Sequence, residues 1–194
     1  GGFAEEREMA TAGAQRRSGR TRELEAWDKA HLWHPFTQAS EWEPEEILIL
    51  ERAVGCWLVD TDGNRYLHGV SSLWVNLHGH GHGAVNRAVS DQLGRVAHTT
   101  LLGLASTASI ECAEELVRIA PAGLTRVFFS DAGATAAEIA LKMAFQHFQL
   151  RGDVERMEFV AIRGGYHGDT IGSVSLGGID LFHRIFKPLL FPVR

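Results

Sequence analysis

Alternating hydrophobic and polar residues between positions 47 and 70 predict three short β-strands. The expected strands are residues 47–51, 56–60 and 65–70. Between the second and the third, Thr61-Asp62-Gly63-Asn64 favours a tight turn, because Asp-Gly and Gly-Asn pairs accept left-handed backbone conformations. Since the strands follow one another closely, the pattern predicts a small antiparallel meander.

Helical spacing replaces this alternation after the meander. Apolar residues at i, i+3, i+4 and i+8 predict a helix that begins at Ala84, and similar patterns predict helices over 107–119 and 135–150. Two apolar runs, 126–130 and 158–162, flank the last helix and predict strands. Strand, helix and strand at this spacing form a βαβ unit, so we expect an α/β fold with a parallel sheet.

These patterns divide the chain into three parts. Residues 1–22 contain few apolar side chains, which predicts a disordered extension. Residues 23–82 form an N-terminal segment, with a short helix over 23–32 that Pro35 ends, followed by the meander. Residues 83–194 form the first part of a larger domain. The chain begins without Met and stops just after an apolar stretch, so we expect this domain to be incomplete.

Composition narrows the class of protein. The 194 residues carry a formal net charge of −5, so no basic surface indicates a nucleic-acid partner. Cys56 and Cys112 form no CxxC pair, which argues against a zinc site or a disulfide framework and favours a reducing, cytoplasmic setting. No apolar run approaches the roughly 20 residues that span a bilayer, so no membrane association is expected.

The junction between the predicted strand 126–130 and the helix that follows is unusually rich in small residues. It reads Ser130-Asp131-Ala132-Gly133-Ala134-Thr135. Small residues let a ligand approach the backbone, and the N–H groups of a first helical turn favour a phosphate; Thr135 adds a hydroxyl. An ordinary turn of closely packed alanines explains the same spacing, and spacing alone favours that interpretation.

A second candidate loop, residues 163–170, follows the predicted strand 158–162. It reads Arg-Gly-Gly-Tyr-His-Gly-Asp-Thr. Loops at the carboxyl ends of parallel strands lie together, so Tyr166 is placed to cover the ring of a flat cofactor whose phosphate lies in the small-residue turn. The alternative is a glycine-rich surface turn. For Asp169, capping of the next helix is favoured over direct catalysis.

Several motifs, taken together, resemble one family. They are Trp33-His34-Pro35-Phe36-Thr37, Gly69-Val70-Ser71-Ser72-Leu73-Trp74, Gly79-His80-Gly81-His82, the segment from Phe129 to Ala144, and Tyr166-His167-Gly168-Asp169-Thr170-Ile171-Gly172. The chain is similar, from about Trp27 to Pro192, to the class III (subgroup II) aminotransferases, and most of all to those of biotin synthesis.

The resemblance implies a fold-type I transferase that depends on pyridoxal 5'-phosphate, works as a homodimer and acts on small molecules. It implies that Ala132, Gly133 and Ala134 hold the cofactor phosphate and that Tyr166 lies against cofactor and substrate. Phe36, Leu73 and Trp74 fall at positions that shape the substrate pocket. The implied reaction aminates 8-amino-7-oxononanoate to 7,8-diaminononanoate, with S-adenosylmethionine, or in some members lysine, as the amino donor.

Two departures from the family pattern affect these expectations. The phosphate turn often reads Ser-Gly-Ser, whereas Ala132-Gly133-Ala134 lacks both hydroxyls, which predicts weaker cofactor binding. Some relatives carry Tyr at the position of Phe36 and Trp at that of Leu73, so the amino donor stays open.

Transamination also needs a lysine that forms a Schiff base with the cofactor. The resemblance implies that this lysine lies beyond residue 194. The chain's own lysines are Lys29, Lys142 and Lys187, and Lys142 is spaced to pair with Glu138 one helical turn away. No catalytic residue is therefore assigned within the chain, which is expected to be inactive and poorly soluble by itself.

Two other interpretations remain. His78, His80 and His82 alternate with glycines, and in an extended segment they would share one side and bind a metal ion. Short patterns of this kind often match by chance. The second alternative is a non-catalytic remnant, or a half-protein that depends on a partner and keeps the dimer surface.

Overall fold

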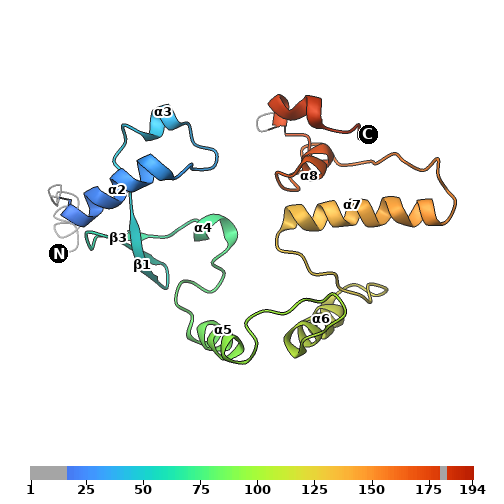
Figure 1. The fold of residues 1–194 in the computed structure, drawn as a ribbon, viewed down its shortest axis with the longest axis horizontal. Helices are drawn as coiled ribbons and strands as arrows, with labels where there is room; N and C mark the ends of the chain where they lie inside the picture. The colour runs from blue at the N-terminus through green and yellow to red at the C-terminus, as the bar shows by residue number, and fades with distance from the viewer. Residues whose placement is uncertain (1–16, 180–182) are drawn as a thin grey trace, which may run out of the picture. The chain divides into compact units, whose positions relative to one another are not determined.

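The computed structural model describes residues 17–179 and 183–194, which form parts of two compact units (Figure 1). The first unit ends at Thr99 and the second begins at Thr100. The division therefore falls after helix α5, Gly83–Arg95, and not at the predicted boundary between 82 and 83. No helix in the described ranges is long and apolar enough to cross a membrane.

The first unit contains the predicted meander. Strands β1 (Leu50–Val54), β2 (Trp57–Asp60) and β3 (Arg65–Leu67) form an antiparallel sheet in the order β1-β2-β3. The strand β1 begins three residues later than predicted, and its register with β2 shifts between Leu50 and Arg52. Ile47, just before β1, and Val59 in β2 are buried, so they form the apolar core of this unit.

The turn between β2 and β3 is organised by one carboxylate. Asp60, only 6% exposed, accepts hydrogen bonds from the backbone N–H groups of Asp62 and Asn64 and from the Tyr66 hydroxyl. Burial opposes ionisation of Asp60, but these hydrogen bonds together outweigh it and lower its pKa. Gly63 supplies the positive φ of 88° that the turn requires.

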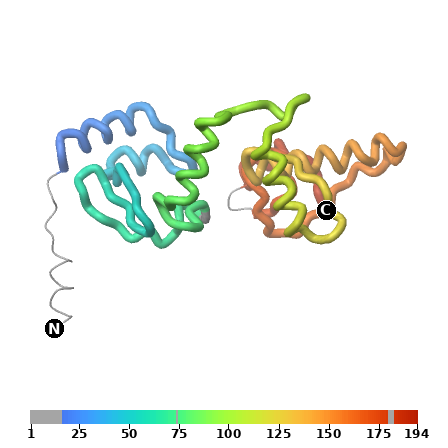
Figure 2. Tube along the Cα trace, turned by 90° about the horizontal axis from the view of Figure 1, so that it is seen from below, coloured from blue at the N-terminus to red at the C-terminus, as the bar shows by residue number. Residues whose placement is uncertain are grey.

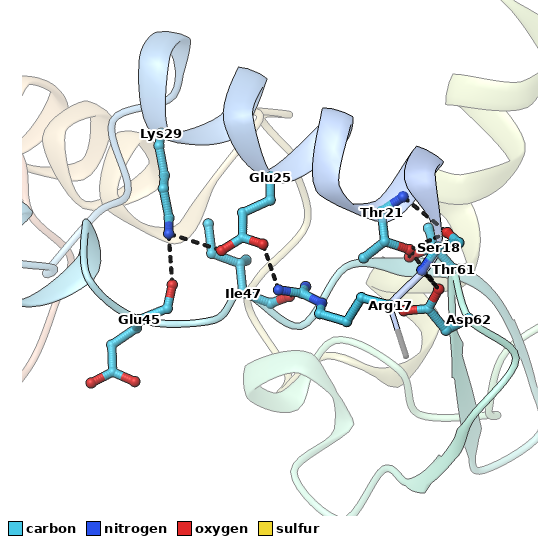
Figure 3. A network of polar contacts seen from close by, with 9 residues as sticks. All are labelled: Arg17, Ser18, Thr21, Glu25, Lys29, Glu45, Ile47, Thr61 and Asp62. Atoms are coloured by element: carbon cyan, nitrogen blue, oxygen red, sulfur yellow. Dashed lines mark hydrogen bonds and ion pairs between the residues drawn. The ribbon is translucent and has the colours of Figure 1, made fainter. Parts of the chain in front are cut away.

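Helix α2 (Gly19–His31) packs against this turn, and Figure 3 shows the polar network that attaches it. Ser18 caps the helix by accepting the Thr21 N–H at 3.1 Å. Thr21, only 2% exposed, donates its hydroxyl proton to Asp62 at 2.8 Å and lies 2.8 Å from the Thr61 hydroxyl. The helix thus begins at Gly19, so the predicted disordered extension 1–22 is wrong for its last residues, while 1–16 lie outside the described residues.

The other end of α2 is attached to the segment that precedes β1. Glu25 forms ion pairs with Arg17 at 2.5 Å and with Lys29 at 2.8 Å, and Lys29 also donates to the Glu45 carbonyl (Figure 3). Arg17 donates to the Ile47 carbonyl. A hydrogen bond from Lys29 is the main reason that the pKa of Glu25 is lowered. The described residues of the unit also form the short helices α3 (Ala39–Trp42) and α4 (Ser71–Trp74).

The second unit is built from helices. Helix α6 spans Thr107–Ile119, as predicted, and α7 spans Gly133–Leu150, two residues longer than predicted at its start. The short helices α8 (Ile171–Leu176) and η1 (Arg184–Leu189) follow. After α7 the chain reverses and returns alongside it, so that α8 packs against the first half of α7 (Figures 1 and 2).

The two predicted strands around α7 are not strands within the described residues. Residues 126–130 form no regular secondary structure, and 158–162 makes one isolated parallel bridge, Phe159 with Val193. A parallel strand is stable when neighbouring strands satisfy its backbone and helices cover its faces. Among the described residues, the backbone of the second segment is bonded to Arg194, through Phe159 and Ala161, and to no neighbouring strand, so the predicted parallel ladder is limited to a single bridge.

Candidate cofactor site

The N-terminus of α7 presents backbone N–H groups that no carbonyl of the same helix can pair. Its N-cap is Ala132, whose methyl side chain cannot accept a hydrogen bond. The N–H groups of Gly133, Ala134 and Thr135 have no acceptor within an α-helix, because the first turn has no preceding carbonyls. The helix dipole adds about half a positive charge at this end. The turn therefore offers an anion several donors and no competing cap.

The Thr135 hydroxyl forms hydrogen bonds within the turn itself. Its hydroxyl accepts the Ala132 N–H at 3.1 Å and donates to the Asp131 carboxylate at 2.7 Å. This bond is the main cause of the lowered pKa of Asp131. The sequence suggested that the Thr135 hydroxyl contributes to phosphate binding, which stays a prediction; in the structure this hydroxyl braces the turn.

The loop 163–170 lies directly against this turn. Gly168 has a φ of 110°, and a Cβ atom built on it would lie 2.7 Å from the Ala134 Cα. Such a distance is shorter than any ordinary contact, so the backbones approach as closely as glycine alone permits. The two segments that the sequence indicated as candidate sites are therefore brought together.

Glu138 holds these two segments in place, a role that the sequence did not reveal. Its carboxylate accepts the Gly172 N–H at 2.6 Å. A hydrogen bond from Thr170 lowers the pKa of Glu138 and outweighs the opposing effect of burial, with a smaller contribution from Lys142. Helical spacing suggested Lys142 as the partner of Glu138. Sequence reasoning missed Thr170 and Gly172, because only the folded chain brings them beside Glu138.

Tyr166 projects from the same loop with its phenol oriented by a carboxylate. The hydroxyl donates to Asp169 at 2.5 Å, and this bond is the main reason that the pKa of Tyr166 is raised. The Tyr166 ring is 49% exposed and lies nearly parallel to the His183 ring, at a centroid distance of 6.3 Å. Asp169 was expected to cap α8, but the N-cap is Thr170 and Asp169 instead accepts from Tyr166.

The expected substrate-pocket residues belong to the first unit, whereas the phosphate turn and Tyr166 belong to the second. Phe36 and Leu73 both have left-handed backbones, with φ of 53° and 56°, and both side chains are largely exposed. Trp74 is the last residue of α4, and its side chain lies outside the described part of the structure.

The segment that carries Phe36 is anchored to helix α2 through His34. The His34 ring lies 2.9 Å from the Asp28 carboxylate, which also accepts the indole N–H of Trp42 at 2.9 Å. Burial opposes ionisation of Asp28, yet the bonds from Trp42 and His34 lower its pKa. A hollow of about 410 Å³ lies beside this anchor and is lined by residues that include Trp33 and Thr37.

The three alternating histidines divide into two groups: the rings of His78 and His82 have centroids 5.3 Å apart, whereas His80 contacts His68. Gly79 and Gly81 have positive φ values of 76° and 72°, so the segment is not extended. His82 also caps α5 by accepting the Val85 N–H. Among the described residues, no group of three or more His, Cys, Asp and Glu side chains is arranged to hold a metal ion.

The sequence pattern of the family described as "Aminotransferase class-III" matches residues 38–194. The chain belongs to the class III aminotransferases. This family depends on pyridoxal phosphate, and the α7 turn fits the phosphate of that cofactor. Its first-turn donors have no side-chain cap, and a Cβ atom built on Gly133 would meet no atom within 4 Å, so there is room for a ligand at the backbone.

Class III relatives with close sequence similarity share one name. Adenosylmethionine-8-amino-7-oxononanoate aminotransferase of Nitratidesulfovibrio vulgaris is 58% identical over 180 residues, which are 91% of this chain and 33% of that protein. The protein of the same name from Methanocaldococcus jannaschii is 50% identical over 168 residues, 87% of this chain and 36% of that protein. The chain thus spans about a third of the length of these curated relatives.

Solved class III structures confirm the fold class. The crystal structure of the Methanocaldococcus jannaschii enzyme matches with a TM-score of 0.86 and 49% identity, over 89% of this chain and 39% of that one. An (S)-enantioselective omega-transaminase from Thermomicrobium roseum matches with a TM-score of 0.83 and 36% identity, over the same shares of the two chains.

Proposed function

We propose that this chain supplies the phosphate turn and part of the substrate pocket of an aminotransferase of biotin synthesis, which converts 8-amino-7-oxononanoate to 7,8-diaminononanoate. The observation that carries the proposal is the close packing of loop 163–170 onto the α7 N-terminus at Gly168 and Ala134. The relatives that bear the name of this enzyme, at 58% and 50% identity, support the choice of substrate.

In this proposal the second unit binds the cofactor. The backbone N–H groups of Gly133 and Ala134, at the positive end of α7, hold the phosphate, and Ala132 leaves those donors uncapped. Tyr166 covers the cofactor ring, and the hydrogen bond to Asp169 orients its phenol and raises its pKa. Bound pyridoxal phosphate would supply the electron sink that transamination requires.

The first unit contributes to substrate selection. Phe36, Leu73 and Trp74 line the pocket for 8-amino-7-oxononanoate and the amino donor. We propose S-adenosylmethionine as the donor, with lysine as the alternative, and a homodimer in the cytoplasm as the working form. None of the three lysines occurs in residues 130–135 or 163–170, so we assign no catalytic residue within this chain and propose that it is inactive alone.

The reaction itself provides the test. Protein expressed from the complete reading frame is incubated with 8-amino-7-oxononanoate and either S-adenosylmethionine or lysine, and the diamine is measured by mass spectrometry. Diamine formed with either donor supports the proposal and identifies the donor. If the protein binds pyridoxal phosphate and transaminates other amines but produces no diamine, the assignment to biotin synthesis is wrong.

A further inference from the structure

The residues that precede Trp74 form a left-handed turn. Ser71, Ser72 and Leu73 have φ values of 52°, 49° and 56°, and none of them is glycine. L-residues enter this region one at a time, because the Cβ atom crowds the following carbonyl. Three in succession persist only where other contacts hold the backbone in place.

His68 makes the contact that holds this turn. The Ser72 backbone N–H donates to the His68 Nε2 at 2.7 Å, and the Ser72 hydroxyl lies 3.1 Å from the same nitrogen. A backbone N–H can only donate, so Nε2 carries no proton, and a neutral His68 has its proton on Nδ1. His68 is thereby assigned a single tautomer.

His80 receives that proton in a hydrogen bond. The His68 Nδ1 lies 2.8 Å from the His80 Nε2, and the two rings are nearly parallel, 21° apart, with centroids 5.0 Å apart. Because Nδ1 of His68 is the donor, Nε2 of His80 is the acceptor and the proton of neutral His80 lies on its own Nδ1. The hydrogen bonds therefore run in one direction, from His68 to His80.

The backbone of His80 is fixed to the meander. His80 and Gly55 exchange two backbone hydrogen bonds, each 2.9 Å long. A Cβ atom on Gly79 would lie 3.0 Å from the Gly55 carbonyl oxygen, so these backbones are tightly packed. His68 is also anchored, because its N–H donates to the Cys56 carbonyl at 2.8 Å. The connection between β1 and β2 thus holds the left-handed turn through two histidines.

We propose that His68 and His80 are positioning residues that set the wall of the substrate pocket by holding Leu73 in the left-handed turn. The inference rests on the proposed function, in which Leu73 contacts substrate. Leu73 is 63% exposed, and the turn that carries it is held through the Ser72 N–H, so the position of the Leu73 side chain depends on that hydrogen bond. Loss of the His68 acceptor lets the turn relax, and Leu73 then moves.

The first measurement needs no substrate. Long-range proton–nitrogen NMR correlations on the full-length protein report which ring nitrogen carries the proton in each histidine. We expect both His68 and His80 as Nδ1–H tautomers, whereas an imidazole in water prefers Nε2–H. A His68 ring protonated on Nε2 would overturn the proposal, whatever reaction the protein catalyses.

The second measurement uses variants. His68→Ala is expected to raise KM for 8-amino-7-oxononanoate about tenfold while pyridoxal phosphate affinity stays unchanged. His68→Gln keeps an acceptor for the Ser72 N–H and should restore most of the loss. Ser72→Gly, which adopts the left-handed conformation without strain, should partly rescue His68→Ala. His78→Ala, a histidine in the same motif but outside this pair, is the control and should behave as the wild type.

The outcomes separate the two proposals. An unchanged KM in a folded His68→Ala protein, or an equal loss in His78→Ala, contradicts the positioning role. If the wild type makes no diamine, the proposed function fails. The Leu73 methyl resonances then decide the positioning role, since they should shift in His68→Ala and return towards the wild-type position on addition of Ser72→Gly.

Discussion

Two glycines in the cofactor loop share a left-handed backbone but differ in their surroundings. Gly168 has a φ of 110° and lies against Ala134 of the phosphate turn. Gly164 has a φ of 78°, and no atom lies within 4 Å of the position that its Cβ would occupy. They therefore separate the cost of backbone strain from the cost of displacing the loop.

Gly168→Ala is expected to lower the affinity for pyridoxal phosphate by about tenfold or more, because the methyl group forces loop 163–170 away from the turn. Gly164→Ala carries a similar backbone strain of about 1 kcal/mol and should leave the affinity nearly unchanged. Absorbance titration of the cofactor into the apoprotein measures both. Equal losses of affinity in the two variants would show that the close approach at Gly168 does not shape the phosphate turn.

Among the elements, α2 depends on one buried polar side chain. Thr21 joins the helix to the β2–β3 turn through Thr61 and Asp62 (Figure 3). Thr21 is buried, so water cannot replace its hydroxyl as the hydrogen-bond partner of Thr61 and Asp62 when that hydroxyl is removed. Hydrogen bonds thus attach this end of α2 to the β2–β3 turn.

Thr21→Val keeps the shape of the side chain and removes these hydrogen bonds, which should weaken the attachment of α2 by about 1–2 kcal/mol. Hydrogen exchange of the α2 backbone amides is the measurement, and it should accelerate. Glu23→Ala, on the exposed surface of the same helix, serves as the control and should change stability by less than about 0.5 kcal/mol. Similar exchange in both variants would mean that α2 is held by other contacts.

Across the whole molecule, both units contain carboxylates whose pKa is lowered by folding. Burial opposes ionisation of Asp60 in the first unit, but hydrogen bonds from Asn64 and Tyr66 prevail. In the second unit, Thr170 is the main cause of the lowered pKa of Glu138. A group with a lower pKa in the folded state stabilises the fold at neutral pH, and this contribution is lost as the pH falls through the folded-state value.

We therefore expect the free energy of unfolding to fall below about pH 4, where Asp and Glu begin to take up protons in the unfolded chain. Asp60→Asn should be less stable than the wild type at pH 7 and lose less stability on acidification, so that the two curves approach each other. Urea unfolding at a series of pH values tests this. Asp91→Asn, on the exposed surface of α5, should follow the wild-type curve, and a flattened curve in that variant would speak against the assignment to Asp60.

Features that neighbours along the chain encode could be predicted from the amino-acid sequence. The Asp62-Gly63 turn and its flanking alternation predicted the meander, and apolar spacing predicted α6 and most of α7. The motifs around Phe36 and Tyr166 were sufficient to indicate the class III family, which the comparisons confirm. Each of these patterns lies within a short stretch of residues, so it can be recognised without knowing the fold.

The choice of hydrogen-bond partners depends on the folded chain. Only folding places Gly172 beside Glu138, Asp169 under the Tyr166 phenol and His80 beside His68. The apolar run 126–130 suggested a strand, but a strand requires a neighbour whose position no local pattern encodes. Periodicity reports which side of an element is apolar, whereas hydrogen-bond partners and strained turns depend on the surfaces that distant segments bring together.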